Sequence, residues 1–313
     1  MVIRLGVLGF SEGNGHPFSF SAIVNGYDDE AMGRAGWPVI HGYLRQRDVT
    51  ELARLDARVT CAWTPDPALT ARLCAAARVE HAVAEPEQMQ GKVDAVMILR
   101  DDADSHLPLA LPFLRVGVPV FVDKPLTRSL PELRTFTPHL EAGRLMSCAA
   151  LRFARELDEP RADLASWGPI TLARGAVVLD WERYGIHMVE AILGVLRRRP
   201  VEVVPVKSLH PAQLAVRLDD DTVVEISCLG AVPKTFRVDF FGCDRATTHD
   251  LVDNFTAFQR TIARFVNMVR TGTPAIPVDD TLDVIRTILA GRAALDLGRA
   301  VRLADLDALL GAQ

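Results

Sequence analysis

The first 150 residues alternate short apolar runs with segments of helical periodicity. Apolar runs of about four to eight residues, bounded by glycine, proline or polar residues, are typical of strands buried on both faces of a parallel sheet. The predicted strands cover residues 2–8, 58–63, 93–99, 118–122 and 144–151. Helices are predicted between them, over residues 18–24, 67–77, 107–115 and 130–141. This alternation indicates an α/β fold with a doubly wound parallel sheet.

The pattern changes after residue 151. Five predicted strands follow one another mostly without helices, at residues 169–179, 201–208, 213–218, 222–229 and 235–242. Two long helices are predicted beyond them, over residues 254–270 and 280–296. We therefore predict an N-terminal domain over residues 1–150 and a C-terminal α+β domain over residues 151–313, built on a largely antiparallel open sheet. The last long helix is a candidate to pack back against the first domain.

Composition and charge exclude several classes of protein. The chain has 313 residues, and its formal net charge of −5 gives no basic surface for nucleic acid. No apolar run approaches the ~20 residues of a membrane span, and the first residues lack the pattern of a signal peptide. Five scattered cysteines without a CxxC pair indicate reduced thiols in a cytoplasmic protein, and nothing suggests a metal site.

A glycine-rich stretch, from Gly9 to His16, follows the first predicted strand. Glycines between a strand and a helix let backbone N–H groups approach a phosphate, and the helix N-terminus adds positive potential. The usual G-x-G-x-x-G pattern is altered, because Ser11 stands in the place of the second glycine and Gly13 follows. The stretch is a weak indication of dinucleotide binding, and a plain tight turn is the alternative.

The end of the second predicted strand bears on the choice of cofactor. An acidic residue usually follows this strand and binds the ribose 2′-hydroxyl of NAD. This chain has Thr64 there, and Asp66 comes two residues later. A 2′-phosphate would meet less repulsion, so the predicted cofactor is NADP or NAD.

The connection between the first two strands is longer than a βαβ unit requires. The excess, about residues 27–48, contains Trp37 and Tyr43. A loop of this length in a compact domain is usually functional or disordered. Its aromatic residues favour an ordered flap at the mouth of a ligand site, and an insertion at a subunit interface is the alternative.

Asp123 and Lys124 end the predicted strand at residues 118–122. Ligands of open α/β sheets bind beyond the carboxyl ends of the strands, where this pair is expected to lie. The chain has only four lysines among 35 basic residues, so a lysine at this place suggests a need for a compact ammonium. An ordinary lysine that reaches water is the alternative.

His187 forms a second candidate for chemistry, at the first turn of a predicted helix. Glu190 follows three residues later on the same helix face. An imidazole oriented by a carboxylate is a common form of general base. A structural histidine at a helix start is the alternative.

The chain resembles the Gfo/Idh/MocA family, which contains glucose–fructose-oxidoreductase-like and inositol-dehydrogenase-like enzymes. The stretches that carry this resemblance have the family's order and rough spacing, at residues 93–106, 117–126, 151–153, 185–187 and 272–303. The most specific are a strand that runs into Asp123-Lys124-Pro125 and the later Gly185-Ile186-His187. The resemblance implies a Rossmann domain, and a second domain whose open sheet often forms the interface of a homo-oligomer, here a dimer or tetramer.

The resemblance also implies roles for single residues. Lys124 would bind the reacting oxygen, Pro125 is often cis in the family, and His187 would be the acid/base. Glu190 replaces the family's usual Asp, and Arg183 stands where a carboxylate is usual. Tyr184, Glu182 or Asp180 are candidates to replace that carboxylate.

Three sets of site residues follow from these motifs. The catalytic candidates are Lys124, His187 and Tyr184. The substrate-binding candidates are Arg152, Arg183, His187 and Glu190. The cofactor-binding candidates are Gly9, Phe10, Ser11, Gly13, Asn14, Thr64, Arg100, His106, Asp123 and Lys124.

The implied activity is hydride transfer between NAD(P) and a hydroxyl or keto group of a sugar, sugar derivative or other polyol. Two alternatives remain open. One is a regulator that binds dinucleotide or sugar without turnover, which the altered glycine pattern and Arg183 favour. The other is an enzyme that uses bound NAD(P) for epimerisation or elimination.

Overall fold

The computed structural model describes residues 2–207 and 211–310. The chain forms two compact units. The first unit comprises Met1–Leu126, Phe136–Ser147 and Phe258–Ile276, and the second comprises Thr127–Thr135, Cys148–Ala257 and Pro277–Gln313. The division predicted at residue 150 stays a prediction.

The first unit is built on a six-stranded sheet in the order β3-β2-β1-β4-β5-β6. Every pair of neighbours is parallel. The strands are β1 (Ile3–Leu8), β2 (Ala57–Trp63), β3 (His81–Ala82), β4 (Ala95–Ile98), β5 (Val120–Val122) and β6 (Leu145–Ser147). All residues of β4, β5 and β6 are buried, as expected of strands covered on both faces. The predicted doubly wound parallel sheet is confirmed.

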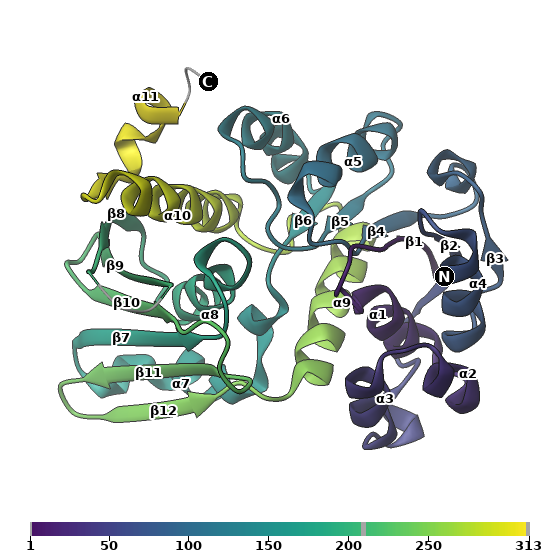
Figure 1. Cartoon of the computed structure of the whole chain (residues 1–313), viewed down its shortest axis with the longest axis horizontal. Helices are drawn as coiled ribbons and strands as arrows, with labels where there is room; N and C mark the ends of the chain where they lie inside the picture. The colour runs from purple at the N-terminus through teal and green to yellow at the C-terminus, as the bar shows by residue number, and fades with distance from the viewer. Residues whose placement is uncertain (1, 208–210, 311–313) are drawn as a thin grey trace. The chain divides into compact units, whose positions relative to one another are not determined.

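Helices cover both faces of this sheet (Figure 1). They are α1 (His16–Asn25), α4 (Pro67–Ala76), α5 (His106–Arg115) and the later parts of α6 (Leu130–Glu141) and α9 (Asn254–Thr271). Figure 1 shows α5 and α6 on one face and α1 and α9 together on the other. The rings of Phe20 on α1 and Phe258 on α9 lie 4.9 Å apart, and Phe121 of β5 packs against Phe265.

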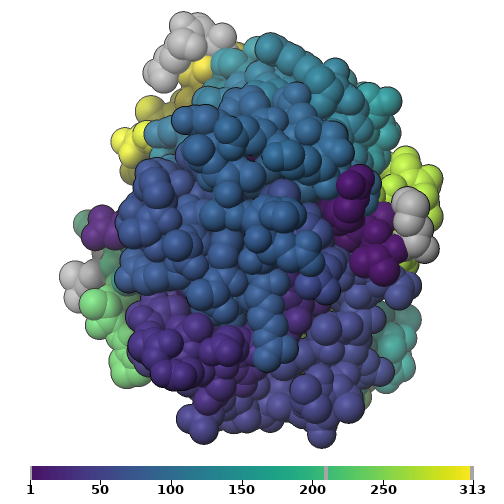
Figure 2. Space-filling model, turned by 90° about the vertical axis from the view of Figure 1, so that its right-hand side faces the viewer, coloured from purple at the N-terminus to yellow at the C-terminus, as the bar shows by residue number. Residues whose placement is uncertain are grey.

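The segment over residues 27–48 is largely helical, so the prediction of a long loop there is wrong. It forms α2 (Asp29–Arg34) and α3 (Pro38–Arg45). The Asp28 side chain accepts a hydrogen bond from the Ala31 N–H and caps α2, and Pro38 begins α3. Figure 2 shows this purple to indigo segment at the surface of the first unit.

The second unit is built on a seven-stranded sheet in the order β12-β11-β7-β10-β9-β8-β13. Among its described strands only β7 and β10 pair in parallel, so the predicted, largely antiparallel sheet is confirmed. The strands are β7 (Ile170–Val177), β8 (Pro200–Pro205), β9 (Ala212–Leu218), β10 (Val223–Cys228), β11 (Phe236–Gly242), β12 (Ala246–Asp250) and β13 (Val301–Arg302). Ser208, the predicted end of the strand at β8, lies outside the described residues.

Two helices, α8 (Ile186–Leu196) and α10 (Val278–Leu297), pack on this sheet, α8 against β7 and α10 against β8. The Trp181 indole N–H donates to the Ile288 carbonyl of α10 at 2.9 Å. Two short helices, α7 (Asp158–Asp163) and α11 (Leu306–Leu310), complete the unit. Within the described part of the chain, no helix is long and apolar enough to cross a membrane.

Candidate functional site

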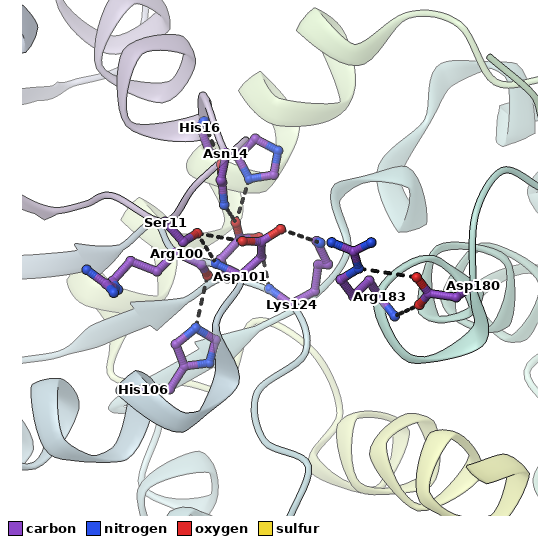
Figure 3. Close-up of polar contacts among 10 residues, drawn as sticks. Ser11, Asn14, His16, Arg100, Asp101, His106, Lys124, Asp180 and Arg183 are labelled. Carbon is purple, nitrogen blue, oxygen red and sulfur yellow. Dashed lines mark hydrogen bonds and ion pairs between the residues drawn. The ribbon is translucent and has the colours of Figure 1, made fainter. Parts of the chain in front are cut away.

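Polar residues follow three neighbouring strands at the carboxyl edge of the first unit's sheet. The glycine-rich turn follows β1, residues 100–102 follow β4, and Asp123 and Lys124 follow β5. The strand order reverses direction between β1 and β4, and such a switch point is where open α/β sheets bind ligands. Figure 3 shows that side chains from these three segments converge.

The glycines of the turn serve different purposes. A Cβ on Gly9 would lie 2.5 Å from Pro17 Cγ, and one on Gly15 would lie 2.7 Å from Trp37 Cε3, so both glycines permit close packing. Gly13 has a φ of +79°, and nothing would lie within 4 Å of an added Cβ. Gly13 is therefore the glycine whose backbone conformation and open side suit the approach of a phosphate. The preceding Gly9–Phe10 peptide is cis.

Ser11, which interrupts the usual glycine pattern, has a partner across the sheet edge. Its hydroxyl donates to Asp101 Oδ1 and accepts from the Asp101 backbone N–H at 3.0 Å. A glycine at this position could make neither bond. The departure from the usual pattern thus joins the turn after β1 to the segment after β4 (Figure 3).

Asp123 is bound by the glycine-rich turn. Asn14 Nδ2 donates to Asp123 Oδ2 at 3.2 Å, His16 Nδ1 pairs with the same oxygen, and the Lys124 N–H donates to Oδ1 at 2.8 Å. Burial acts to raise the pKa of Asp123, but attraction to His16 and Lys124 and the hydrogen bonds outweigh it and lower the pKa to about 2. The carboxylate is therefore ionised at neutral pH and holds the turn against the end of β5.

Lys124 is a buried ammonium at the end of β5. Its side chain is 6% exposed, and Nζ lies 3.8 Å from Asp101 Oδ2. The Lys124–Pro125 peptide is cis. Burying a charge is unfavourable unless it is paired, so a lysine held here beside Asp101 is typical of a functional site.

Arg100 and His106 shape the segment after β4. The Arg100 guanidinium pairs with Asp102, with Nη2 2.6 Å from Oδ2. The fully buried His106 places Nε2 2.9 Å from the Arg100 carbonyl and Nδ1 3.1 Å from the Leu126 carbonyl. These contacts tie the ends of β4 and β5 together, which makes His106 a positioning residue in this structure; its predicted contact with a cofactor stays a prediction.

A cavity of about 440 Å³ opens beside the end of β2. Phe10 of the glycine-rich turn, Trp37 before α3, and Arg72 and Asp66 of the α4 region line it. Thr64 itself is buried. Its hydroxyl donates a hydrogen bond to the Asp66 carbonyl at 2.7 Å and lies within hydrogen-bond distance of the Thr70 hydroxyl, at 2.9 Å. Thr64 therefore shapes the start of α4, and the exposed charges beside the cavity belong to Asp66 and Arg72.

The second unit brings together two of its site candidates, Tyr184 and His187. Residues Trp181–Gly185 form a π-helical turn that runs into α8 and places His187 in its first turn, as predicted. The rings of Tyr184 and His187 lie 5.6 Å apart, and that of Phe236 on β11 lies 5.5 Å from His187. The imidazole is thus packed within an aromatic cluster.

Arg183 lies on the same π-helical turn, with its side chain 56% exposed. Its Nε lies 3.2 Å from Asp180 Oδ2, and Asp180 Oδ1 accepts from the Arg183 N–H at 2.9 Å (Figure 3). Asp180 therefore caps this turn, as an Asp or Asn caps a helix. Glu182 Oε2 lies 3.5 Å from Arg128 Nη1, and Glu182 Oε1 lies 3.6 Å from Arg292 Nε.

Glu190 and Arg152 form a buried pair. Glu190 Oε2 accepts from the Ala149 N–H at 2.6 Å, and Oε1 lies 3.9 Å from Arg152 Nη1. Arg152 also pairs with Asp280 at the start of α10. Among the described residues, these are the hydrogen-bond and ion-pair partners of Glu190, and His187 is not one of them. The sequence-based hypothesis that Glu190 orients His187 therefore finds no support in its contacts.

We expect Glu190 to give the protein a pH-dependent stability. Burial raises the pKa of Glu190 to about 7 from its usual 4.5, against the lowering effects of Arg152 and the Ala149 N–H. A raised folded-state pKa contributes stability below pH 4.5 that is lost as the pH rises towards 7. For a shift of this size the loss is roughly 3 kcal/mol. Urea unfolding from pH 4 to 8 should show that the free energy of unfolding of the wild type falls by this amount relative to that of Glu190→Gln. If the free energies of the two proteins changed in parallel with pH, the prediction would be contradicted.

Two residues of this site were not found from the sequence. Asp101 is the second residue after a predicted strand, a position that could have marked it. His16 was treated only as the end of the glycine-rich stretch, because its bond to Asp123 joins residues 107 positions apart. Among the described residues, no group of three or more His, Cys, Asp or Glu side chains is placed to hold a metal ion.

Comparisons with known proteins agree with this geometry. Residues 33–144 match the GFO_IDH_MocA family, described as an oxidoreductase family with an NAD-binding Rossmann fold. No curated protein matches the sequence.

Solved structures are similar over nearly the whole chain. Apo scyllo-inositol dehydrogenase from Lactobacillus casei has a TM-score of 0.76 at 15% identity, covering 97% of this chain and 98% of that one. The same enzyme with bound NAD(H) and scyllo-inositol has a TM-score of 0.75 at 15% identity, covering 97% and 100%. Myo-inositol dehydrogenase from L. casei, in complex with NAD(H) and myo-inositol, has a TM-score of 0.74 at 12% identity, covering 96% and 97%.

At such low identity these structures establish the shared fold alone. The family match supports the resemblance that the motifs predicted: residues 33–144 match the NAD-binding Rossmann fold of the Gfo/Idh/MocA oxidoreductase family.

Proposed function

We propose that the protein is an NAD(P)-dependent dehydrogenase or reductase that acts on a hydroxyl or keto group of a sugar, sugar derivative or other polyol. The observation that carries the proposal is Lys124, a buried ammonium at the carboxyl end of β5 in an NAD-binding Rossmann fold. The polyol class is supported by the L. casei enzymes of the same fold, whose structures contain inositols. A homo-oligomer, dimer or tetramer, formed through the open sheet of the second unit, is part of the proposal.

The residues of the first unit fit a dinucleotide. Gly13 has a positive φ and an open side, α1 begins just after the turn, and the cavity beside β2 lies where the adenosine half of a dinucleotide is expected. A bound nicotinamide would accept or supply the hydride.

Lys124 and His187 have separate roles in the proposed reaction. The Lys124 ammonium stabilises negative charge that develops on the reacting oxygen, because a fixed donor in a site without water is worth more than one in bulk solvent. His187 takes the hydroxyl proton during oxidation and returns it during reduction. Tyr184, in ring contact with His187, is the alternative proton carrier.

One argument for a member without turnover has lost its basis. The altered glycine pattern favoured such a regulator, but Ser11 is bonded to Asp101 and so has a structural role in this chain. Turnover decides between the remaining possibilities. Incubation of the purified protein with NAD⁺ or NADP⁺ and a panel of inositols and sugars should produce the absorbance of reduced nicotinamide. Conversion of substrate without reduced cofactor would favour epimerisation or elimination.

We expect NADP(H) to bind at least as tightly as NAD(H). Thr64 offers no negative charge at the end of β2, and Arg72, which lines the cavity, can pair with a 2′-phosphate. Loss of such a charged hydrogen bond costs about 1.5–3 kcal/mol of binding free energy. Arg72→Gln should therefore raise the dissociation constant of NADPH by about tenfold or more and leave that of NADH unchanged. Titration by nicotinamide fluorescence measures both. A strong preference of the wild type for NADH would contradict this expectation and would indicate that Asp66 binds the ribose of NAD(H).

A further inference from the structure

Asp101 stands between the glycine-rich turn and the lysine at the end of β5. Its Oδ1 accepts from the Ser11 hydroxyl, and its Oδ2 lies 3.8 Å from Lys124 Nζ. Figure 3 shows these three side chains in a row, from the turn after β1, the segment after β4 and the end of β5. One carboxylate thus links all three segments of the site.

The other carboxylate nearby is already engaged. Asp123 Oδ2 is bound by Asn14 and His16, and its Oδ1 accepts the backbone N–H of Lys124. Asp123 therefore fixes the main chain and the turn. Asp101 reaches the ammonium itself, with Oδ2 3.8 Å from Lys124 Nζ.

Two hydrogen bonds with Ser11 fix the orientation of the Asp101 side chain. The Ser11 hydroxyl donates to its side chain and accepts from its backbone N–H, so Ser11 and Asp101 form a closed pair of hydrogen bonds. The Asp101 side chain is 25% exposed, and that of Lys124 is 6% exposed. A charged pair with little access to water is weakly screened, so the carboxylate strongly influences where the ammonium settles.

We propose that Asp101 is a positioning residue for Lys124, and that Ser11 orients Asp101 so that the ammonium is held in register with the dinucleotide-binding turn. The inference rests on the proposed function, in which Lys124 acts on the reacting oxygen. It also gives a reason for Ser11 in place of glycine. No covalent step is involved, because Asp101 acts through the place and direction of the lysine.

The kinetic test is a double-mutant cycle. Asp101→Asn keeps the shape of the side chain and removes its charge, and we expect kcat to fall about 10- to 10²-fold, the scale for a misplaced catalytic group. The dissociation constants of the cofactors should stay close to those of the wild type. In a Lys124→Met background, Asp101→Asn should have no further effect. Asp104→Asn, an exposed carboxylate in the same segment, is the matched control.

A second readout does not depend on turnover. The chain has four lysines, so protein labelled with ¹⁵N at lysine Nζ should give few side-chain resonances, and Lys124→Met identifies that of Lys124. Asp101→Asn should shift this resonance and leave the others, whereas Asp104→Asn should shift none. Ser11→Ala should produce a smaller shift in the same resonance. If Asp101→Asn fails to fold, Asp101→Ser serves in its place.

The outcomes separate the inference from the proposed function. A Lys124 resonance that does not respond to Asp101→Asn, or kinetic losses that multiply in the double variant, would overturn the positioning role. A resonance that responds while Lys124→Met turns over like the wild type would instead refute the catalytic role of Lys124, and the inference would fall with it.

Discussion

Replacement of Lys124 by methionine is expected to lower kcat by about 10² or more, the scale for removing one donor to a developing oxyanion. Methionine fills a similar volume at the buried end of β5 but cannot stabilise negative charge. Cofactor binding should persist, because the glycine-rich turn and the cavity beside β2 are unchanged. Steady-state kinetics, with nicotinamide fluorescence to measure cofactor binding, separates the two effects.

Two further lysine variants sharpen this result. Lys124→Arg should also fail, because a planar guanidinium cannot replace a compact ammonium in a buried position. Lys92→Met, at an exposed lysine of the same unit, should behave as the wild type. If folded Lys124→Met retained activity within a few-fold of the wild type, Lys124 would be removed from the mechanism.

Replacement of His187 by glutamine is expected to slow both directions of the reaction by about 10²–10⁴-fold, the usual contribution of a general acid–base. Only the neutral imidazole can accept a proton, so wild-type kcat/KM for oxidation should rise with pH in a single step. Reduction needs the imidazolium and should fall over the same range. The pH profile of His187→Gln should lose this step in both directions.

Tyr184→Phe is the matched control for that variant. It keeps the ring that packs against His187 and Phe236 and removes only the hydroxyl. We expect it to preserve the pH step. A step that survives in His187→Gln and disappears in Tyr184→Phe would transfer the proton-carrying role to the phenol.

The strands and helices that position the site could be predicted because each has a local signal. The buried strands β1, β4 and β5 are short apolar runs, and the first turn of α8 falls where the spacing placed it. The strands β12 and β13 escaped prediction. The first has a polar sequence with no apolar alternation, and the second has only two residues.

The contacts within the site could not be predicted, because they join distant residues. Ser11 interrupts a familiar glycine pattern, and its reason lies 90 residues away in Asp101. Glu190 illustrates the same limit on one helix. Spacing put it on the face of His187, but its carboxylate bonds Ala149 and lies near Arg152, which come from outside the helix.

The long connection after β1 shows how weak local signals are missed. Asp28 and Pro38 start helices of six and eight residues there, and with one buried residue in α2 and two in α3 each helix offers few core positions from which a helical period can be read. Trp37 and Ile40 from this segment pack over Gly15, which explains one glycine of the turn without any reference to a ligand.

The central claim, hydride transfer from a polyol to the nicotinamide, can be tested directly with a deuterated substrate. The protein would be incubated with NADP⁺ or NAD⁺ and a panel of polyols that carry deuterium on the carbinol carbons, and the reduced cofactor would be analysed by mass spectrometry. The proposed function predicts that reduced cofactor forms and carries one deuterium from the substrate, and that Lys124→Met forms little of it. Reduced cofactor without deuterium, or no reduction by the wild type with any polyol although the cofactor binds, would contradict it.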